Sequence, residues 1–299
     1  MKKPHPWIER YRAHMVASGK FEEGTTITDR CELLYRLDAE LPLGLLEATI
    51  EELENWMASG RTAARRGRRS APWSRQTKAT YFGHIVGFYG FASDPNRMPH
   101  LSYDPSASLS RPKVPSRDPQ PCTTEDLERL LARARAPFLT YCILTAYAGL
   151  RPIQISNLDR ENITEQHIYV AGKGGKVSTI PTHPAIWAAV RDFPRGPIAT
   201  VTHRGQVFRA TADYLSTCTS REIERALGHP GVTLRNVRHW YATTLLTEKE
   251  LGGAGANLRT VQELMCHASV ATTAIYTRVV GRQRDLAISA LPSLAPTPN

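Results

Sequence analysis

The sequence predicts a mainly α-helical protein with one small β-sheet, divided into two domains. Apolar residues recur every three or four positions along most of the chain, which is typical of amphipathic helices. Residues 94–121 hold seven prolines, a density typical of a linker. The length of 299 residues suggests about two domains, and an apolar content of 41% is typical of a folded protein.

The predicted N-terminal domain, residues 1–93, has four helices, at about 6–18, 26–39, 45–58 and 74–92. The segment that leads into the fourth helix is strongly basic. Seven basic residues fall within eighteen positions that contain no acidic residue: Arg61, Arg65, Arg66, Arg68, Arg69, Arg75 and Lys78. Most basic runs are solvated loops, but the missing acidic partners favour contact with phosphates here.

The second predicted domain, residues 122–281, is also mainly helical. Its helices are expected near 124–135, 137–149, 183–193, 210–227, 236–250, 258–266 and 270–276. Two short strands, at 167–170 and 177–181, flank a Gly-Lys-Gly-Gly-Lys turn and form the one predicted sheet. Residues 282–299 are expected to form a last helix and a tail.

Composition narrows the function classes. The net charge of +10 and the pI near 9.6 make a polyanion the first partner to consider. No apolar stretch approaches the ~18 residues that a membrane span needs, and charges interrupt the N-terminus before a secretory signal can form. We therefore expect a cytoplasmic protein. Its five scattered cysteines, without a C-x-x-C pair, indicate neither a disulfide framework nor a zinc site.

Four segments carry the motifs that point to a family. They are residues 145–159 (TAYAGLRPIQISNLD), 172–181 with its GKGGK turn, 235–243 (RNVRHWYAT) and 261–276 (VQELMCHASVATTAIY). An arginine after a helix, a lysine in a turn or a tyrosine in an apolar helix is usually structural when taken alone. In this order, however, the segments resemble the tyrosine site-specific recombinases, also called phage integrases. Residues 73–91 resemble that family's core-binding domain.

The resemblance implies a fold and a set of catalytic residues. The fold is an N-terminal helical core-binding (SAM-like) domain and a C-terminal catalytic domain, which form a clamp around DNA. Tyr276 would attack a DNA phosphorus and form a phosphotyrosine, while Arg151 and Arg238 hold the phosphate oxygens. Lys173 would protonate the departing 5′-oxygen, and His267 would donate a hydrogen bond to the phosphate. No cofactor or metal ion is implied.

Two residues depart from the family pattern. Arg235 stands where the family usually has a histidine that accepts the proton of the tyrosine. Arginine, with a pKa above ~12, is a poor base. We therefore expect Arg235 to be a third electrostatic anchor, with the proton passing to another group or to water. Gln154 stands where the family commonly has an acid, so the orientation of Arg151 must come from elsewhere.

The resulting functional prediction is a DNA recombinase that integrates phage or mobile-element DNA into a host chromosome. Its partners would be double-stranded DNA with specific core sites and further copies of itself, as a tetramer in the synaptic complex. The tail at 282–299 would be exchanged between protomers, and a directionality factor is a further candidate partner. Three alternatives remain: a chromosome-resolution recombinase, a type IB topoisomerase and a non-catalytic DNA-binding protein.

Overall fold

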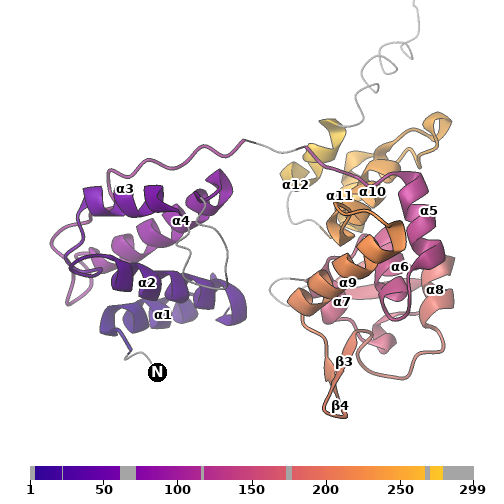
Figure 1. Cartoon of the computed structure of the whole chain (residues 1–299), viewed down its shortest axis with the longest axis horizontal. Coiled ribbons are helices and arrows are strands. Elements are labelled where there is room, and N and C mark those ends of the chain that lie inside the picture. Colours follow the sequence, from indigo (N-terminus) through magenta and orange to yellow (C-terminus); the bar gives the residue numbers. More distant parts are fainter. Residues whose placement is uncertain are drawn as a thin grey trace, which may run out of the picture. The chain divides into compact units, whose positions relative to one another are not determined.

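The chain forms two compact units, Met1–Ser116 and Arg117–Asn299, in a computed structural model (Figure 1). The structure describes residues 4–21, 23–60, 72–115, 118–172, 177–266 and 270–278. The predicted C-terminal helix and tail, 282–299, lie outside these residues. Within the described ranges, no helix is long and apolar enough to cross a membrane.

The first unit is a small helical domain. Its helices are α1 (Pro6–Ser18), α2 (Thr28–Glu40), α3 (Ile50–Ser59) and α4 (Arg75–Ala92), with a π-helical turn at Glu23–Ile27 before α2. Four helices were predicted here, and the structure confirms all four. The third begins at Ile50 rather than near 45, because Thr49 and Glu52 form a reciprocal capping box.

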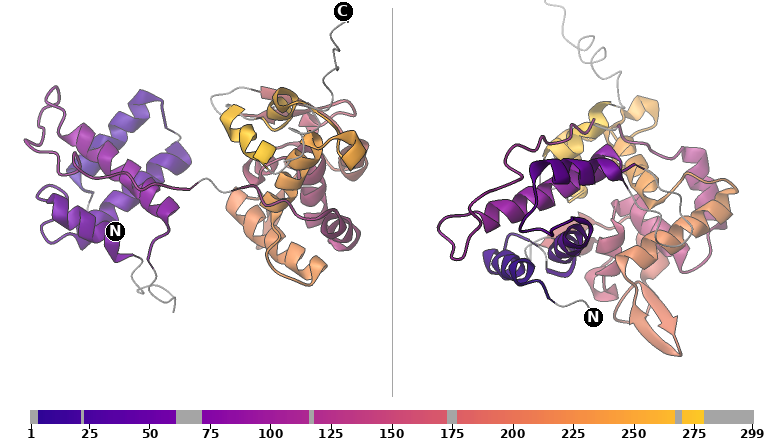
Figure 2. Two further views of the ribbon diagram at one scale, coloured as in Figure 1. Left: turned by 90° about the horizontal axis from the view of Figure 1, so that it is seen from above. Right: turned by 60° about the vertical axis from the view of Figure 1, so that its left-hand side comes forward.

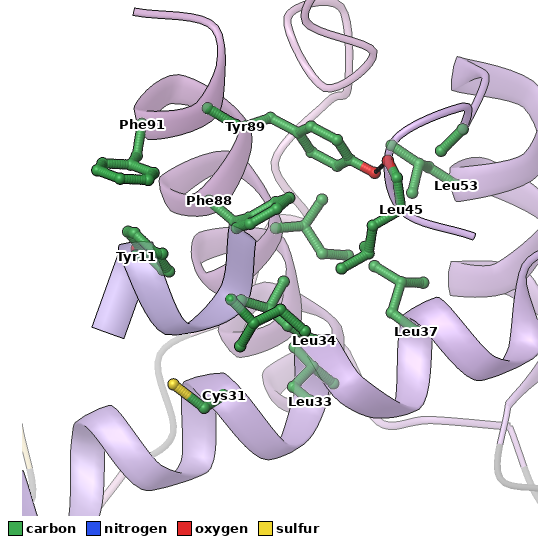
Figure 3. Packing of buried hydrophobic residues seen from close by; sticks show 14 of the residues in the cluster. Tyr11, Cys31, Leu33, Leu34, Leu37, Leu45, Leu53, Phe88, Tyr89 and Phe91 are labelled. Carbon is green, nitrogen blue, oxygen red and sulfur yellow. Dashed lines mark hydrogen bonds between the residues drawn. The ribbon is translucent and has the colours of Figure 1, made fainter. Parts of the chain in front are cut away.

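The core of this unit is apolar and includes a buried hydrogen bond (Figure 3). Phe88 and Tyr89 on α4 are fully buried, and Leu34 and Leu37 on α2 lie in the same cluster. The Tyr89 hydroxyl donates a 2.8 Å hydrogen bond to the Leu45 carbonyl oxygen. A buried hydroxyl needs such a partner, so this bond holds the loop before α3 against α4.

An aromatic cluster joins α3 to the start of α4. The rings of Trp56 and Trp73 have centroids 4.5 Å apart, and Tyr81 stands edge-on to Trp73 at 5.0 Å. The Arg36 guanidinium lies 5.0–5.5 Å from all three ring centroids, which is within cation–π distance. This cluster therefore holds α3, which precedes the basic segment, in contact with the start of α4, which follows it.

Some of the predicted DNA-binding residues lie within the part of the chain that the structure describes, and others lie outside it. Arg65, Arg66, Arg68 and Arg69 lie outside the described residues. Arg75 and Lys78 lie at the start of α4, where Ser74 caps the helix by accepting a hydrogen bond from the Thr77 backbone N–H. Arg75 is exposed, so its charge is available to a ligand.

The proline-rich segment packs on the first unit along much of its length. Leu101 and Leu109 contact the core of that unit, and Arg10 donates hydrogen bonds to the Met98 and Pro99 carbonyl oxygens. The first compact unit ends at residue 116, whereas the first domain was predicted to end at residue 93. Proline prevents helix formation but leaves the interspersed leucines free to pack, which accounts for the difference.

The second unit is mainly helical, in agreement with the predicted fold class (Figure 2). Its helices are α5 (Thr124–Arg133), α6 (Phe138–Ala148), α7 (Pro152–Ser156), α8 (Pro184–Val190), α9 (Ala212–Leu227), α10 (Leu234–Leu246), α11 (Leu258–Leu264) and α12 (Val270–Ala274). Short 3₁₀ turns lie at Arg160–Asn162, Lys249–Leu251 and Ile275–Arg278. The short helix α7 was not predicted.

One small sheet was predicted for the second unit, and its described residues hold a second one: two antiparallel hairpins are present there. One joins β1 (His167–Ala171) to β2 (Val177–Pro181), as predicted, with His167 opposite Pro181. The other joins β3 (Thr200–His203) to β4 (Gln206–Arg209) and projects from the unit (Figure 1). Its strands are short and mostly exposed, so they carry no burial alternation. The signal available was the two-residue Arg204-Gly205 turn, where both residues have positive φ.

Helix α6 is the centre of the second unit. Most of its residues are buried, and it packs against α5, α8, α9 and α10. A helix that is buried on nearly all sides is a rigid support. The chain leaving its C-terminal end reaches Arg151, and its neighbour α10 carries Arg235, Arg238 and His239.

Candidate active site

Four of the six predicted catalytic residues line one pocket of about 680 Å³. Arg151 follows α6, Arg235 and Arg238 lie on α10, and Tyr276 lies in the 3₁₀ turn Ile275–Arg278. Lys173 and His267 lie outside the described residues. Segments 125 positions apart in the sequence therefore meet in one pocket, as the proposed chemistry requires.

Arg238 is fixed by main-chain acceptors. It is 7% exposed, its Nη1 donates to the Gly149 carbonyl oxygen, and its Nη2 donates to the Met265 carbonyl oxygen at 2.9 Å. Burial lowers the pKa of the guanidinium to about 10, and the neighbouring Arg151 cation adds to this. The group stays positive at neutral pH, and the carbonyl acceptors hold it without cancelling its charge.

Gly149 is required where α6 ends beside α10. Its φ is +60°, in the left-handed region, and a Cβ there would lie 2.5 Å from Tyr241 Cδ1 and 3.2 Å from Met265 Sδ. A side chain at this position would therefore be strained and would also collide with the segments that hold Arg238.

We expect Gly149→Ala to destabilise the protein by about 2–5 kcal/mol, since left-handed strain of ~1–2 adds to overpacking of ~1–3. Urea unfolding would measure this loss. Gly228→Ala is the matched control: Gly228 also ends a helix, with φ +79°, but a Cβ there meets nothing within 4 Å. Equal losses in the two variants would show that the collision with Tyr241 contributes nothing.

Arg151 is held at the start of α7. Its backbone N–H donates a 2.9 Å hydrogen bond to Gln154 Oε1, and Pro152 takes the first helical position. Gln154 thus orients the main chain at Arg151. Burial lowers the pKa of the Arg151 guanidinium, while Tyr276 and Cys266 oppose the effect.

The Tyr276 side chain is 3% exposed and contacts the imidazole of His239. Its hydroxyl oxygen lies 3.0 Å from His239 Nδ1, and Arg235 Nε donates a 3.2 Å hydrogen bond to His239 Nε2. Burial raises the pKa of the Tyr276 phenol, and the Arg238, Arg151 and Arg235 cations oppose this rise. Burial, with Arg235 and Arg238, lowers the pKa of His239 to about 4, so this imidazole is neutral at pH 7.

His239 is the site residue that sequence reasoning missed. It was not among the predicted catalytic residues, whereas the structure places its ring against the candidate nucleophile. Its spacing was the available signal: Arg235 and His239 are four residues apart and so share one face of α10.

The charge of this pocket favours an anion. Three arginines line it, and Asp213 is the acid among its lining residues. Arginine donates in a fork that matches phosphate oxygens, so the arrangement suits a phosphodiester. Within the described ranges, no three His, Cys, Asp or Glu side chains are grouped so that they could hold a metal ion.

Comparison with known protein families shows which family this chain belongs to. A family model described as "Phage integrase family" matches residues 122–282, more than half of the chain. The chain belongs to the phage integrase family. This finding confirms the resemblance to tyrosine site-specific recombinases seen in the four sequence motifs.

Named relatives of this phage integrase family member are tyrosine recombinases. The XerC recombinase of Mesorhizobium japonicum is 31% identical over 192 residues, which cover 58% of this chain and 60% of the relative. The XerD recombinase of Caulobacter vibrioides is 30% identical over 269 residues, which cover 83% and 79%. The match spans 60%, 64% and 56% of the lengths of three curated relatives.

Solved structures show the same fold. A dimer of lambda integrase residues 75–356 bound to a core site has a TM-score of 0.67 at 17% identity and covers 94% of this chain and 97% of that one. A lambda integrase tetramer bound to a Holliday junction has a TM-score of 0.66 at 16% identity and covers 93% and 78%. The phage integrase fold is therefore confirmed for this chain.

Proposed function

We propose that this protein cuts and rejoins DNA strands at specific sites through a 3′-phosphotyrosine intermediate. The observation that carries the proposal is a tyrosine hydroxyl in a pocket lined by three arginines, one beside α7 and two on α10. A phenol that attacks phosphorus keeps the energy of the phosphodiester in a covalent bond, so the strand can be rejoined without a cofactor.

The roles proposed for the described residues follow from their chemistry. Tyr276 Oη forms a bond to phosphorus while the bond from phosphorus to the 5′-oxygen breaks. Arg151 and Arg238 hold the non-bridging oxygens, on which negative charge concentrates in the transition state. Arg235 is a third anchor at the same phosphate.

Two further roles come from the family resemblance, because their residues lie outside the described part of the chain. Lys173 would give a proton to the departing 5′-oxygen. His267 would donate a hydrogen bond to the phosphate.

DNA is the proposed partner of both units. The net charge of +10 is consistent with a polyanionic partner. Residues 1–93 would be the core-binding domain, 94–121 the linker and 122–281 the catalytic domain, together closing as a clamp around a duplex with specific core sites. The DNA-contacting side chains would be Arg65, Arg66, Arg68, Arg69, Arg75 and Lys78.

Assembly on DNA is proposed to give a tetramer in the synaptic complex. The support is the likeness in fold to a lambda integrase structure solved as a tetramer bound to a Holliday junction. Residues 282–299 would be exchanged between protomers, and a directionality factor would be an additional partner.

Integration of phage or mobile-element DNA is the biological role we propose, since divergence from the family pattern at Arg235 and Gln154 is expected in mobile elements. The protein would act in the cytoplasm or nucleoid of the host cell. Resolution of chromosomes is a second candidate, favoured by the likeness to XerC and XerD recombinases.

Covalent capture of DNA tests the activity. Binding sites are first selected from random duplexes by the full chain, and a nicked duplex carrying a selected site is then offered. Denaturing electrophoresis is expected to show a protein–DNA adduct, and trypsin should place it in the peptide 260–278, whose one tyrosine is Tyr276. A chain that binds the duplex but forms no adduct would overturn the proposal and leave a non-catalytic DNA-binding protein. Relaxation of plasmid without site preference would indicate a type IB topoisomerase.

A further inference from the structure

Three side chains form a continuous chain of hydrogen bonds behind the candidate nucleophile. Arg235 Nε lies 3.2 Å from His239 Nε2, and His239 Nδ1 lies 3.0 Å from Tyr276 Oη. Arg235 and His239 face the same way because they are one helical turn apart on α10, while Tyr276 comes from the turn Ile275–Arg278. His239 is 7% exposed, so water does not readily replace either contact.

The chemistry of these groups decides the direction of each bond. Arginine has donors and no acceptor, so Nε2 of His239 must accept from Arg235. A neutral imidazole carries one N–H, which must therefore sit on Nδ1. Nδ1 then donates to Tyr276 Oη, and the tyrosine oxygen is the acceptor in this pair.

The surroundings favour the neutral ring. His239 faces the cations Arg235 and Arg238 on its own helix, Arg151 across the pocket, and the phenol of Tyr276; Asp213 also lines the pocket, from α9. Burial and the two cations on α10 keep the pKa of His239 at about 4. A second proton on this ring at pH 7 would place a further positive charge among three arginines.

We propose that Arg235 fixes the tautomer of His239, and that His239 is a hydrogen-bond donor that stabilises the Tyr276 phenolate rather than the base that takes its proton. This rests on the proposed function of the site. It also explains how an arginine can occupy the position of the family's usual histidine.

The proton balance of cleavage follows. The phenol proton passes to water or hydroxide in the pocket, and the Nδ1–H bond stabilises the negative charge left on Oη. Oη then forms its bond to phosphorus as the bond from phosphorus to the 5′-oxygen breaks, and the 5′-oxygen takes a proton from the general acid, Lys173. Rejoining reverses these steps.

The tautomer can be measured without DNA. ¹⁵N NMR of the full chain labelled at histidine is expected to show His239 protonated on Nδ1 at pH 7, and the loss of that signal in His239→Asn assigns it. Arg235→Met should abolish the preference for Nδ1–H. Arg259→Met is the matched control, since Arg259 bonds Glu263 and Gln262 on α11. Protonation on Nε2 in the unaltered chain would overturn the proposal whether or not the protein cleaves DNA.

The pH profile of adduct formation tests the donor role. His239→Leu removes the donor, so the rising limb of the pH profile should shift to higher pH by about one unit. Cleavage should be ~10-fold slower at pH 7 and should recover in alkali. His239→Asn places an amide N–H close to the position of Nδ1 and should recover most of the loss. If His239 is instead the base, its removal should slow cleavage ~10²–10⁴-fold at pH 7. An asparagine amide cannot take up a proton, so His239→Asn would then be as slow as His239→Leu, and the proposal fails. Absence of any adduct with the unaltered chain would refute the proposed function, and the NMR result would still decide the tautomer.

Discussion

Replacing Tyr276 by phenylalanine is expected to abolish covalent capture of DNA. The substitution removes the one atom that can form the bond to phosphorus and keeps the ring that packs in the apolar cluster with Leu246 and Val261. DNA affinity should stay near that of the unaltered chain, because phosphate contacts by arginine and lysine supply most of the binding. Electrophoresis under denaturing conditions measures the adduct, and a filter or gel-shift assay measures the affinity.

Tyr241→Phe is the matched control for this result. Tyr241 is also buried, at 7% exposure, belongs to the same apolar cluster and has a phenol pKa raised to about 12 by burial. The same oxygen is lost in both variants, but Tyr241 has no proposed contact with the phosphate. An adduct that persists in Tyr276→Phe would place the nucleophile elsewhere and remove the central assignment of the site.

Arg238→Lys is expected to slow adduct formation by ~10²–10³-fold at saturating DNA. Lysine keeps a positive charge but lacks the planar fork that bonds the Gly149 and Met265 carbonyl oxygens while facing the pocket. The charge would therefore no longer be held where the phosphate oxygens develop theirs. Single-turnover rates measure the effect, and urea unfolding shows whether the variant remains folded under the assay conditions.

The exposed pair of Arg259 and Glu263 provides the control for this substitution. Arg259→Lys changes the same chemical group on α11, outside the pocket, and should leave the single-turnover rate unchanged. A folded Arg238→Lys variant that cleaves within ~3-fold of the unaltered rate would contradict a role in transition-state stabilisation, because one preorganised donor is worth far more than that.

Apolar periodicity was sufficient to locate most helices. The pattern at 74–92 predicted α4 closely, and the mainly helical fold class followed from many such segments. The five-residue helix α7 and the hairpin β3–β4 were missed because such short elements lack a full period of buried residues. The packing of Leu101 and Leu109 was missed because it depends on a surface that exists only after the first unit has folded.

The sequence by itself determined the family and which residues had to meet, because the order of its motifs pointed to Arg151, Arg235, Arg238 and Tyr276. Only the tertiary structure decided what lies between them. It places His239 between Arg235 and Tyr276, which are 41 positions apart in the sequence, so local spacing shows only half of that chain of hydrogen bonds. The reason is physical: the direction of a hydrogen bond depends on which donors and acceptors share a buried space, and folding alone brings those groups within 3.2 Å of one another.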